Sequence, residues 1–187
     1  MDDASDRRPI RSSRLELVLM APTFIEALLE GRRGDAARII EADIPRAWPG
    51  PHDARFLRLR LEQIEREPDV QDWLVRAVVL REPERVMVGH AGFHGAPGVN
   101  GPGRVGALEL GYTIFSSFRG RGYATEVAAA LVAWARAERG VRDFIASVGP
   151  DNAPSLAVVT KLGFHQTGEQ WDEEDGRELV FERTFDV

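Results

Sequence analysis

Two arginines and two glycines stand side by side in the segment Arg119-Gly120-Arg121-Gly122. In residues 125–139, just after it, apolar side chains recur at helical spacing. A glycine-rich turn that leads into a helix directs several backbone N–H groups at one point, where the helix dipole adds positive potential. A Cβ in such a turn would block close approach of the backbone. The segment therefore predicts a site for an anion such as a phosphate. The alternative is a solvated arginine turn that only caps the helix.

Two common phosphate-binding motifs are excluded by the residues present. A P-loop requires Gly-Lys-Ser or Gly-Lys-Thr, and neither occurs in the sequence. A dinucleotide-binding loop requires a third glycine where Thr125 stands, together with an early βαβ unit, and both are missing. An anion at this turn must therefore belong to a different class of ligand.

Three motifs in order along the chain resemble those of the GNAT N-acetyltransferase superfamily. Arg119-x-x-Gly122-x-Ala124 is similar to its acyl-CoA motif, Gln/Arg-x-x-Gly-x-Gly/Ala, and residues 108–114 resemble its fourth strand. Asn-Ala-Pro-Ser at 152–155 and Lys-Leu-Gly-Phe at 161–164 resemble signatures of its RimJ/RimL-like branch, which includes acetyltransferases of ribosomal-protein N-termini. The resemblance extends over roughly residues 15–185.

The resemblance implies that acetyl-CoA binds as a cosubstrate. Strands 108–114 and 144–148 are expected to splay apart, with the pantetheine arm in the gap and the pyrophosphate on the amides of residues 120–124. Gly111 is expected to mark a bulge that opens the gap, or else tight packing under a helix. The implied cofactor-binding residues are Ile114, Phe115, Ser116, Arg119, Gly120, Arg121, Gly122, Tyr123, Ala124, Thr125, Asn152 and Ser155.

Acetylation of an amine needs a neutral amine and a protonated leaving thiolate. Because the sequence has no cysteine and shows no Ser-His-Asp pattern, direct attack by the amine is favoured over an acyl-enzyme. By similarity to the RimL-like branch, Ser155 is the candidate acid and Asn152 binds the pantetheine. Their alternatives are an ordinary first-turn serine and a simple N-cap. Glu109, flanked by leucines on a central strand, is the candidate base, unless it faces solvent or pairs with an arginine.

Two histidines are four residues apart on one predicted strand, His90 and His94. Period-two alternation places them on one face, but no third ligand has matching spacing, so we expect no metal site. They are expected to be polar strand positions or to line the substrate groove.

The composition limits the classes of partner. The longest apolar run, residues 127–135, has nine residues, whereas about 20 are needed to cross a bilayer. A net charge of −6 opposes a nucleic-acid partner. Residues 1–13 lack the apolar core of a secretory signal and are expected to form a disordered tail. We therefore expect a cytoplasmic protein, and the absence of cysteine is compatible with a reducing compartment.

The remaining patterns predict an α+β fold within a single domain, residues 14–187. The order of elements predicts a mixed sheet with helices on its faces, and the resemblance implies the GNAT acyl-CoA N-acyltransferase fold, with about seven mostly antiparallel strands. The C-terminal hairpin leaves a sheet edge, from which we expect a monomer–dimer equilibrium that slightly favours the dimer. The expected strands are 14–20, 73–80, 85–93, 107–114, 144–148, 164–171 and 178–185, and the expected helices are one or two within 21–39, then 53–67, 125–139 and one ending at Gly163.

These observations together predict transfer of an acetyl group from acetyl-CoA to a primary amine, which is a protein N-terminus or a small-molecule amine. A non-catalytic acyl-CoA-binding sensor or scaffold with the same fold is the alternative. Residues 21–70 and the glycine-rich loop 95–106 are expected to set the acceptor, which the sequence does not name.

Overall fold

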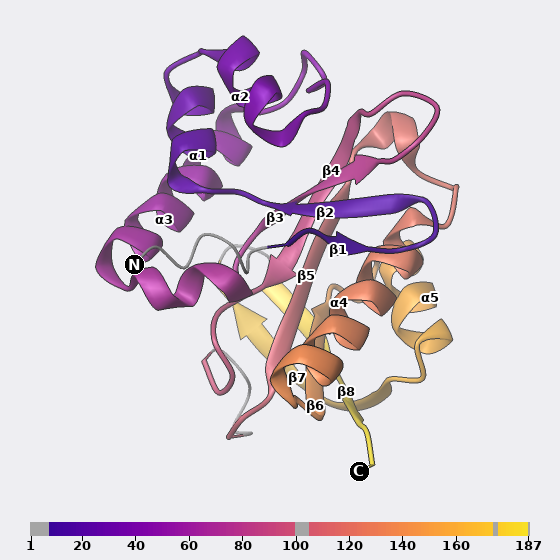
Figure 1. Ribbon diagram of the computed structural model, residues 1–187. Coiled ribbons are helices and arrows are strands. Elements are labelled where there is room, and N and C mark those ends of the chain that lie inside the picture. Colours follow the sequence, from indigo (N-terminus) through magenta and orange to yellow (C-terminus); the bar gives the residue numbers. More distant parts are fainter. Residues whose placement is uncertain (1–7, 100–104, 174–175, 187) are drawn as a thin grey trace.

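A mixed sheet forms the centre of the molecule (Figure 1). The computed structural model describes residues 8–99, 105–173 and 176–186, and within them the strand order is β1-β2-β3-β4-β5-β6-β8-β7. Only β5 and β6 run parallel; the other neighbouring pairs are antiparallel. The strands are β1 Ile10–Arg11, β2 Leu15–Leu19, β3 Arg76–Leu80, β4 Met87–Phe93, β5 Leu108–Ile114, β6 Asp143–Val148, β7 His165–Asp172 and β8 Gly176–Thr184.

Helices cover both faces of this sheet, as predicted (Figure 1). On one face α1 (Pro22–Leu29), α2 (Arg33–Ile40) and α3 (Pro51–Arg66) enclose one apolar core. On the other face α4 (Tyr123–Arg139) and α5 (Ala153–Lys161) enclose a second. Because side chains alternate across each strand, the central strands supply residues to both cores. Two short 3₁₀ helices complete the set, η1 Pro68–Trp73 and η2 Ser116–Phe118.

The expected count of about seven strands is one too low for the described residues, because β1 lies within the predicted disordered tail. Ile10 is only 6% exposed and pairs with Leu17 of β2. A single apolar residue among arginines and serines gives no alternating pattern, so the edge of β2 and not the local sequence makes this strand. Residues 1–7 of the predicted tail lie outside the described residues.

The start of β3 also differs from the prediction. The strand begins at Arg76, and Trp73 belongs to η1. The Trp73 ring packs edge-on against Trp134 of α4 and Phe93 of β4, at 5.7 and 6.2 Å between centroids. Its apolar character therefore reflects packing between layers and not a place in the strand.

The strands β5 and β6 are joined over a short stretch only. Their register has two pairs, Leu108↔Phe144 and Glu109↔Ile145, and the strands separate beyond them. The expected splay is confirmed, but Gly111 is not a bulge, because the β4–β5 register passes through Gly92↔Gly111 without a shift. A Cβ on Gly111 would lie 2.8 Å from Nε2 of His94. This glycine therefore makes room for a histidine ring, and not for a helix.

Candidate functional site

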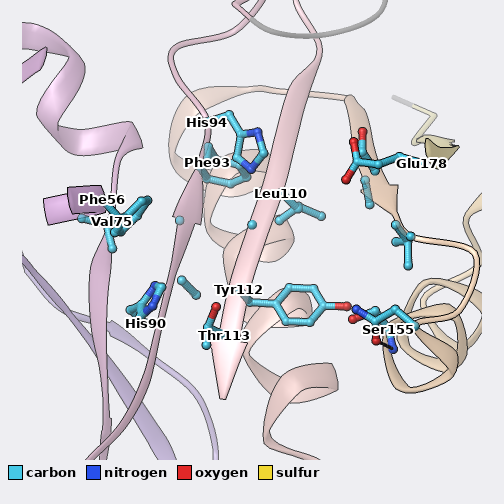
Figure 2. Close-up of a pocket in the computed structure, with 18 of the residues that line it drawn as sticks. Phe56, Val75, His90, Phe93, His94, Leu110, Tyr112, Thr113, Ser155 and Glu178 are labelled. Carbon is cyan, nitrogen blue, oxygen red and sulfur yellow. Dashed lines mark hydrogen bonds between the residues drawn. The ribbon is translucent and has the colours of Figure 1, made fainter. Parts of the chain in front are cut away.

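A pocket of about 520 Å³ opens where β5 and β6 separate. Residues 110–113 of β5 and 146–149 at the end of β6 form two of its sides, and α3 contributes Phe56 and Arg60. Figure 2 shows His90 and Phe56 on one side of β5 and Ser155 and Glu178 on the other. Phe56 comes from α3 on one face of the sheet and Ser155 from α5 on the other, so the pocket lining draws on both faces.

The predicted anion-binding turn leads from η2 into α4. Gly120 and Gly122 have φ of +75° and +79°, the left-handed region that favours glycine. A Cβ at Gly120 would meet nothing within 4 Å, so the turn is open to a ligand. Within the described chain, the N–H groups of residues 120–124 donate no hydrogen bond to a loop, a turn or a side chain. Together with the positive end of α4, these N–H groups give the turn the donors and the potential that an anion would need.

The segment between β1 and β2 holds this turn in place. Arg14 donates from Nη1 to the carbonyl of Arg121 at 3.0 Å and from Nε to Glu126 at 2.7 Å. Its guanidinium also lies 4.6 Å from the centre of the Tyr123 ring, and Ser12 donates to Glu126 at 2.7 Å. Burial raises the pKa of Glu126, but the hydrogen bonds from Ser12 and Arg14 outweigh it and hold that pKa below its usual value. We call Ser12, Arg14 and Glu126 the N-terminal clamp.

The residues just before the turn point in different directions. The Ile114 side chain is buried in the core, and its carbonyl accepts a hydrogen bond from Nε of Arg119 at 3.0 Å. Phe115 is half-buried, with its ring near Trp48, and Ser116 is exposed. Of the predicted cofactor contacts in this stretch, the Ser116 side chain and the backbone are therefore the groups within a ligand's reach.

Two predicted residues at the start of α5, Asn152 and Ser155, line the pocket. Asn152 is the N-cap, and its Oδ1 accepts a hydrogen bond from the backbone N–H of Ser155 at 3.2 Å. Capping occupies this oxygen, while the Ser155 hydroxyl stays available.

Tyr112, which the sequence did not single out, points its hydroxyl at Ser155 across the gap (Figure 2). This hydroxyl is buried and, within the described residues, has no hydrogen bond of full geometry. Burial raises the pKa of Tyr112, and the nearby Ser155 offsets part of that rise. The pocket thus places two hydroxyls together at the start of α5.

Glu109 stands at its predicted place on β5 but is enclosed, at 4% exposure, and is not part of the pocket lining. Its Oε1 accepts a hydrogen bond from Ser147 at 2.7 Å, and its Oε2 lies 3.3 Å from Nδ1 of His94. The His94 side chain is 40% exposed and lines the pocket. Glu109 therefore does not reach the pocket itself but contacts His94, which lines it.

A second polar chain supports this carboxylate from the far side. Gln170 of β7 donates from Nε2 to Ser147 at 3.0 Å and to Glu178 of β8 at 2.9 Å. Every link satisfies a polar group that would otherwise be costly to bury. The network fixes the orientation of Glu109 and of the imidazole beside it.

The opposite side of the pocket is aromatic. The ring of His90 stacks on Phe56 at 5.3 Å and lies 6.1 Å from Trp48 and 6.4 Å from Phe115. Burial lowers the pKa of His90 to about 4, with Arg60 adding to the fall and Asp53 opposing it. His90 is thus neutral near pH 7 and acts as one more ring of the wall. Both His90 and His94 line the pocket, but His94 lies just after β4 and not on the predicted strand.

The structure brings the predicted site residues into two groups. The residues of the turn form the first group. Asn152 and Ser155, which line the pocket, form the second group together with Glu109, which lies behind the pocket wall. Sequence reasoning missed Tyr112, Ser147 and Arg60, whose roles depend on partners far away in the chain. Of these three residues, only Ser147 stands out in its local sequence, because it is a polar residue in an apolar strand. Within the described residues no cluster of three or more metal-ligating side chains occurs.

Comparison with known proteins gives a family match over most of the chain. Residues 14–165 match the family described as "Acetyltransferase (GNAT) domain". A curated relative, the uncharacterized N-acetyltransferase YnaD of Bacillus subtilis, is 29% identical over 106 residues, 51% of this chain. The match spans 58% of that relative's length, so the chain spans little more than half of it. None of the described helices is long and apolar enough to cross a membrane.

Solved structures share the fold at low sequence identity. A protein from Bordetella pertussis assigned to the GNAT-family acetyltransferases has a TM-score of 0.69 at 23% identity and covers 95% of this chain and 100% of its own. A structure of RimL, described as a ribosomal L7/L12 α-N-protein acetyltransferase in complex with coenzyme A, has a TM-score of 0.63 at 19% identity. That match covers 96% of this chain and 99% of RimL. At these identities the likeness shows the fold.

Proposed function

Because the chain belongs to the GNAT acetyltransferase family, we propose that it transfers the acetyl group of acetyl-CoA to a primary amine by direct attack. One observation supports this most: a pocket with polar groups opens where β5 and β6 separate, and the chain runs on from β5 through η2 into a turn with free backbone N–H groups. Acetyl-CoA supplies an activated acyl group, and the chain has no cysteine to carry that group covalently.

The turn fits the pyrophosphate of coenzyme A. The open space at Gly120 and the free N–H groups of residues 120–124 suit phosphate oxygens, while Arg119 and Arg121 add two charges at an exposed site. The pantetheine arm of coenzyme A would bind along the separated edges of β5 and β6. This binding would use backbone groups and needs no particular side chain. Asn152 would contribute its amide to the same arm, since capping occupies only its oxygen.

Ser155 is the proposed proton donor to the leaving sulfur. It lines the pocket at the start of α5, where positive potential lowers the cost of a developing negative charge. The Tyr112 hydroxyl beside it supplies a second proton, so the serine can be reprotonated without water. The two hydroxyls would act as a relay, with Ser155 in contact with the reacting atoms.

His94 is the proposed proton acceptor for the amine, with Glu109 as its positioning residue. The imidazole lines the pocket, whereas Glu109 is enclosed. A carboxylate at Nδ1 fixes the tautomer in which Nε2 accepts a proton, and it stabilises the imidazolium that results. The role first expected of Glu109 alone is thus shared by the pair.

The branches of the family differ in the acceptor amine that they acetylate. The RimJ/RimL-like motifs favour an α-amine, and RimL is described as a ribosomal L7/L12 α-N-protein acetyltransferase. An α-amine titrates near ~7.7–8.0, close enough to neutrality for a histidine to deprotonate it. We therefore propose an α-amine as the acceptor in preference to a lysine side chain.

Release of coenzyme A thiol from acetyl-CoA, measured over a panel of amines, tests the activity. We expect amine-dependent release, with the acetylated amine detected by mass spectrometry. Calorimetric titration with coenzyme A gives the second measurement. Binding without turnover on any amine would contradict the enzyme and favour the non-catalytic acyl-CoA-binding sensor or scaffold.

Assembly into a homodimer is a further part of the proposal. Within the described residues β7 ends the sheet on one side, and Trp171 on it is 78% exposed. A free strand edge with an exposed tryptophan favours pairing with a second copy. Light scattering at micromolar concentration should give a mass above 20.8 kDa. A mass of one chain, unchanged in Trp171→Ala, would contradict the dimer. The cytoplasmic location stays a prediction.

A further inference from the structure

Arg60 is a cation in the pocket without a counter-ion. It lines the same pocket as His94, and no carboxylate of the described residues lies within ion-pair distance of it. Its Nη1 donates to Gln63 at 2.8 Å and, at 3.3 Å, to the carbonyl of His94. Its Nε is buried and has no partner among the described residues. The guanidinium thus keeps donors unused.

Its surroundings hold the guanidinium in position. The Phe56 ring lies 5.0 Å from its central carbon, and the two hydrogen bonds connect α3 to the residue after β4. Burial lowers the pKa of Arg60, and no neighbouring carboxylate offsets that effect. An anion that entered the pocket would supply the missing charge and accept charge-assisted hydrogen bonds from a donor already in place.

A comparison with another buried arginine shows that lack of a partner alone is not the signal. Arg76 also has a buried nitrogen without a hydrogen bond. However, its guanidinium lies over the Trp134 ring at 5.0 Å, donates to the carbonyl of Asp72, and does not line the pocket. Arg76 therefore fills a structural role, while Arg60 faces a space that a ligand can enter.

The position of Arg60 limits which kind of molecule can carry the bound anion. Because the guanidinium donates to the backbone carbonyl of His94 and both residues line the pocket, an anion bound to Arg60 shares the pocket with the proposed proton acceptor. Two carboxylates also line the pocket, Asp53 and Glu178. Asp53 is seven residues from Arg60 on α3, roughly 10 Å along the helix axis. The pocket therefore offers a cation beside the reaction centre and acidic groups around it, which suits a zwitterion.

We infer that Arg60 binds a carboxylate of the acceptor and that the acceptor is a free α-amino acid. This inference rests on the proposed acetyl transfer. In an α-amino acid the amine and the carboxylate share one carbon, so the carboxylate on Arg60 leaves the amine beside His94. A polyamine or an aminoglycoside has no carboxylate, and a protein N-terminus has an uncharged amide at that position.

Matched pairs of acceptors test the inference. The standard α-amino acids and their α-amides have the same amine and side chain and differ in the carboxylate. Loss of a hydrogen bond to a charged group corresponds to a change of roughly 10–100-fold, and we expect kcat/KM for the best amino acid to exceed that for its amide by this factor. Equal values for acid and amide would overturn the inference and leave the acetyl transfer standing.

Variants locate the effect. In Arg60→Gln the ratio of acid to amide should fall to about one. Arg60→Lys, which keeps the charge but not the planar fork, should retain part of the ratio. Arg58→Gln is the matched control, because Arg58 is exposed on the same helix and does not line the pocket, and the ratio should equal that of the wild type. An unchanged ratio in folded Arg60→Gln would also overturn the inference.

A binding measurement separates the inference from the proposed function. With coenzyme A present, calorimetric titration of the wild type should show the amino acid binding more tightly than its amide, and Arg60→Gln should abolish this difference. If no amine releases thiol but the difference in binding is found, the acetyl transfer fails and the carboxylate subsite stands. If neither acid nor amide binds or reacts while other amines are acetylated, the subsite fails alone.

Discussion

The turn before α4 and the pocket wall between α3 and the end of β4 present different parts of their residues to a ligand. The turn offers backbone N–H groups in one short stretch, and its glycines provide the positive φ and the open space. The wall offers side chains, with Arg60 and Phe56 from α3 and His94 from beyond β4. A backbone site recognises what all cosubstrates of a class share, whereas a side-chain site can change with one substitution.

The two regions also differ in what holds them. Local geometry shapes the turn, and the N-terminal clamp adds contacts from a segment over 100 residues away, since the contact of Arg14 with Glu126 joins residues 112 apart. The wall depends on packing between helix α3 and the sheet and on the polar contacts that hold Arg60 and His94. Substitutions in the first region should therefore affect cosubstrate binding, and substitutions in the second should affect the acceptor and the chemistry.

The largest expected effect is at the turn. Gly122→Val should reduce coenzyme A affinity by on the order of 10³-fold, because a branched side chain at φ of +79° alters the turn and covers its N–H groups. The positive φ also adds strain of about 1–3 kcal/mol, so thermal unfolding must show that the variant is folded. Calorimetry with coenzyme A is the measurement, and unchanged affinity in the folded variant would remove the turn from the cosubstrate site.

The next effect separates chemistry from binding. Ser155→Ala should lower kcat by about 10²–10⁴-fold, the usual range for acid–base catalysis, with nearly unchanged coenzyme A affinity. The backbone N–H of Ser155 keeps its bond to Asn152, so the cap is preserved. If the serine were only a first-turn residue, kcat would persist, and the unfolding free energy would change little because the cap remains. Steady-state kinetics distinguish the two, and urea unfolding shows that the variant is folded.

A smaller effect distinguishes the members of the His94–Glu109 pair. His94→Gln should reduce the rate roughly 10²-fold near neutral pH, and Glu109→Gln should reduce it less, because an unpaired imidazole can still accept a proton. Both deficits should shrink toward pH ~9, where an α-amine is already neutral. The pH–rate profiles of both variants provide the test. A deficit in Glu109→Gln with wild-type behaviour of His94→Gln would make Glu109 the direct base.

The smallest effect is on stability and arises at the aromatic wall. His90 titrates near 4 in the folded chain, below its usual 6.5, so the unfolded chain binds a proton first as the pH falls. Its contribution to stability is complete above pH 6.5 and is lost as the pH falls toward 4. His90→Phe should therefore flatten the pH dependence of the unfolding free energy in this window by up to about 1.4 kcal/mol per pH unit. Urea unfolding at several pH values across the window gives the unfolding free energy as a function of pH. If this dependence in His90→Phe has the same slope as in the wild type, the prediction is wrong.

The difference between the two regions also explains what the sequence could predict. The turn, α4 and the capped start of α5 carry their signals in neighbouring residues, and the prediction of these elements is confirmed within one or two residues. The prediction of β1 as a tail is wrong at Ile10, whose partner lies in β2. Arg60 gave no signal, because an arginine on an amphipathic helix is ordinary until its lack of a counter-ion is known. The sequence singles out His94 as a groove-lining candidate, but its contact with Glu109 in the next strand depends on the fold and not on the local sequence.

The N-terminal clamp makes the turn and the sheet edge one cooperative unit. A ligand that binds the ordered turn must also favour the ordered state of Ser12 and Arg14, because thermodynamic linkage is reciprocal. Saturating coenzyme A should therefore slow amide hydrogen exchange in β1 and β2, although no ligand atom needs to reach these strands. The first strand of the chain would then act as a reporter of cosubstrate occupancy.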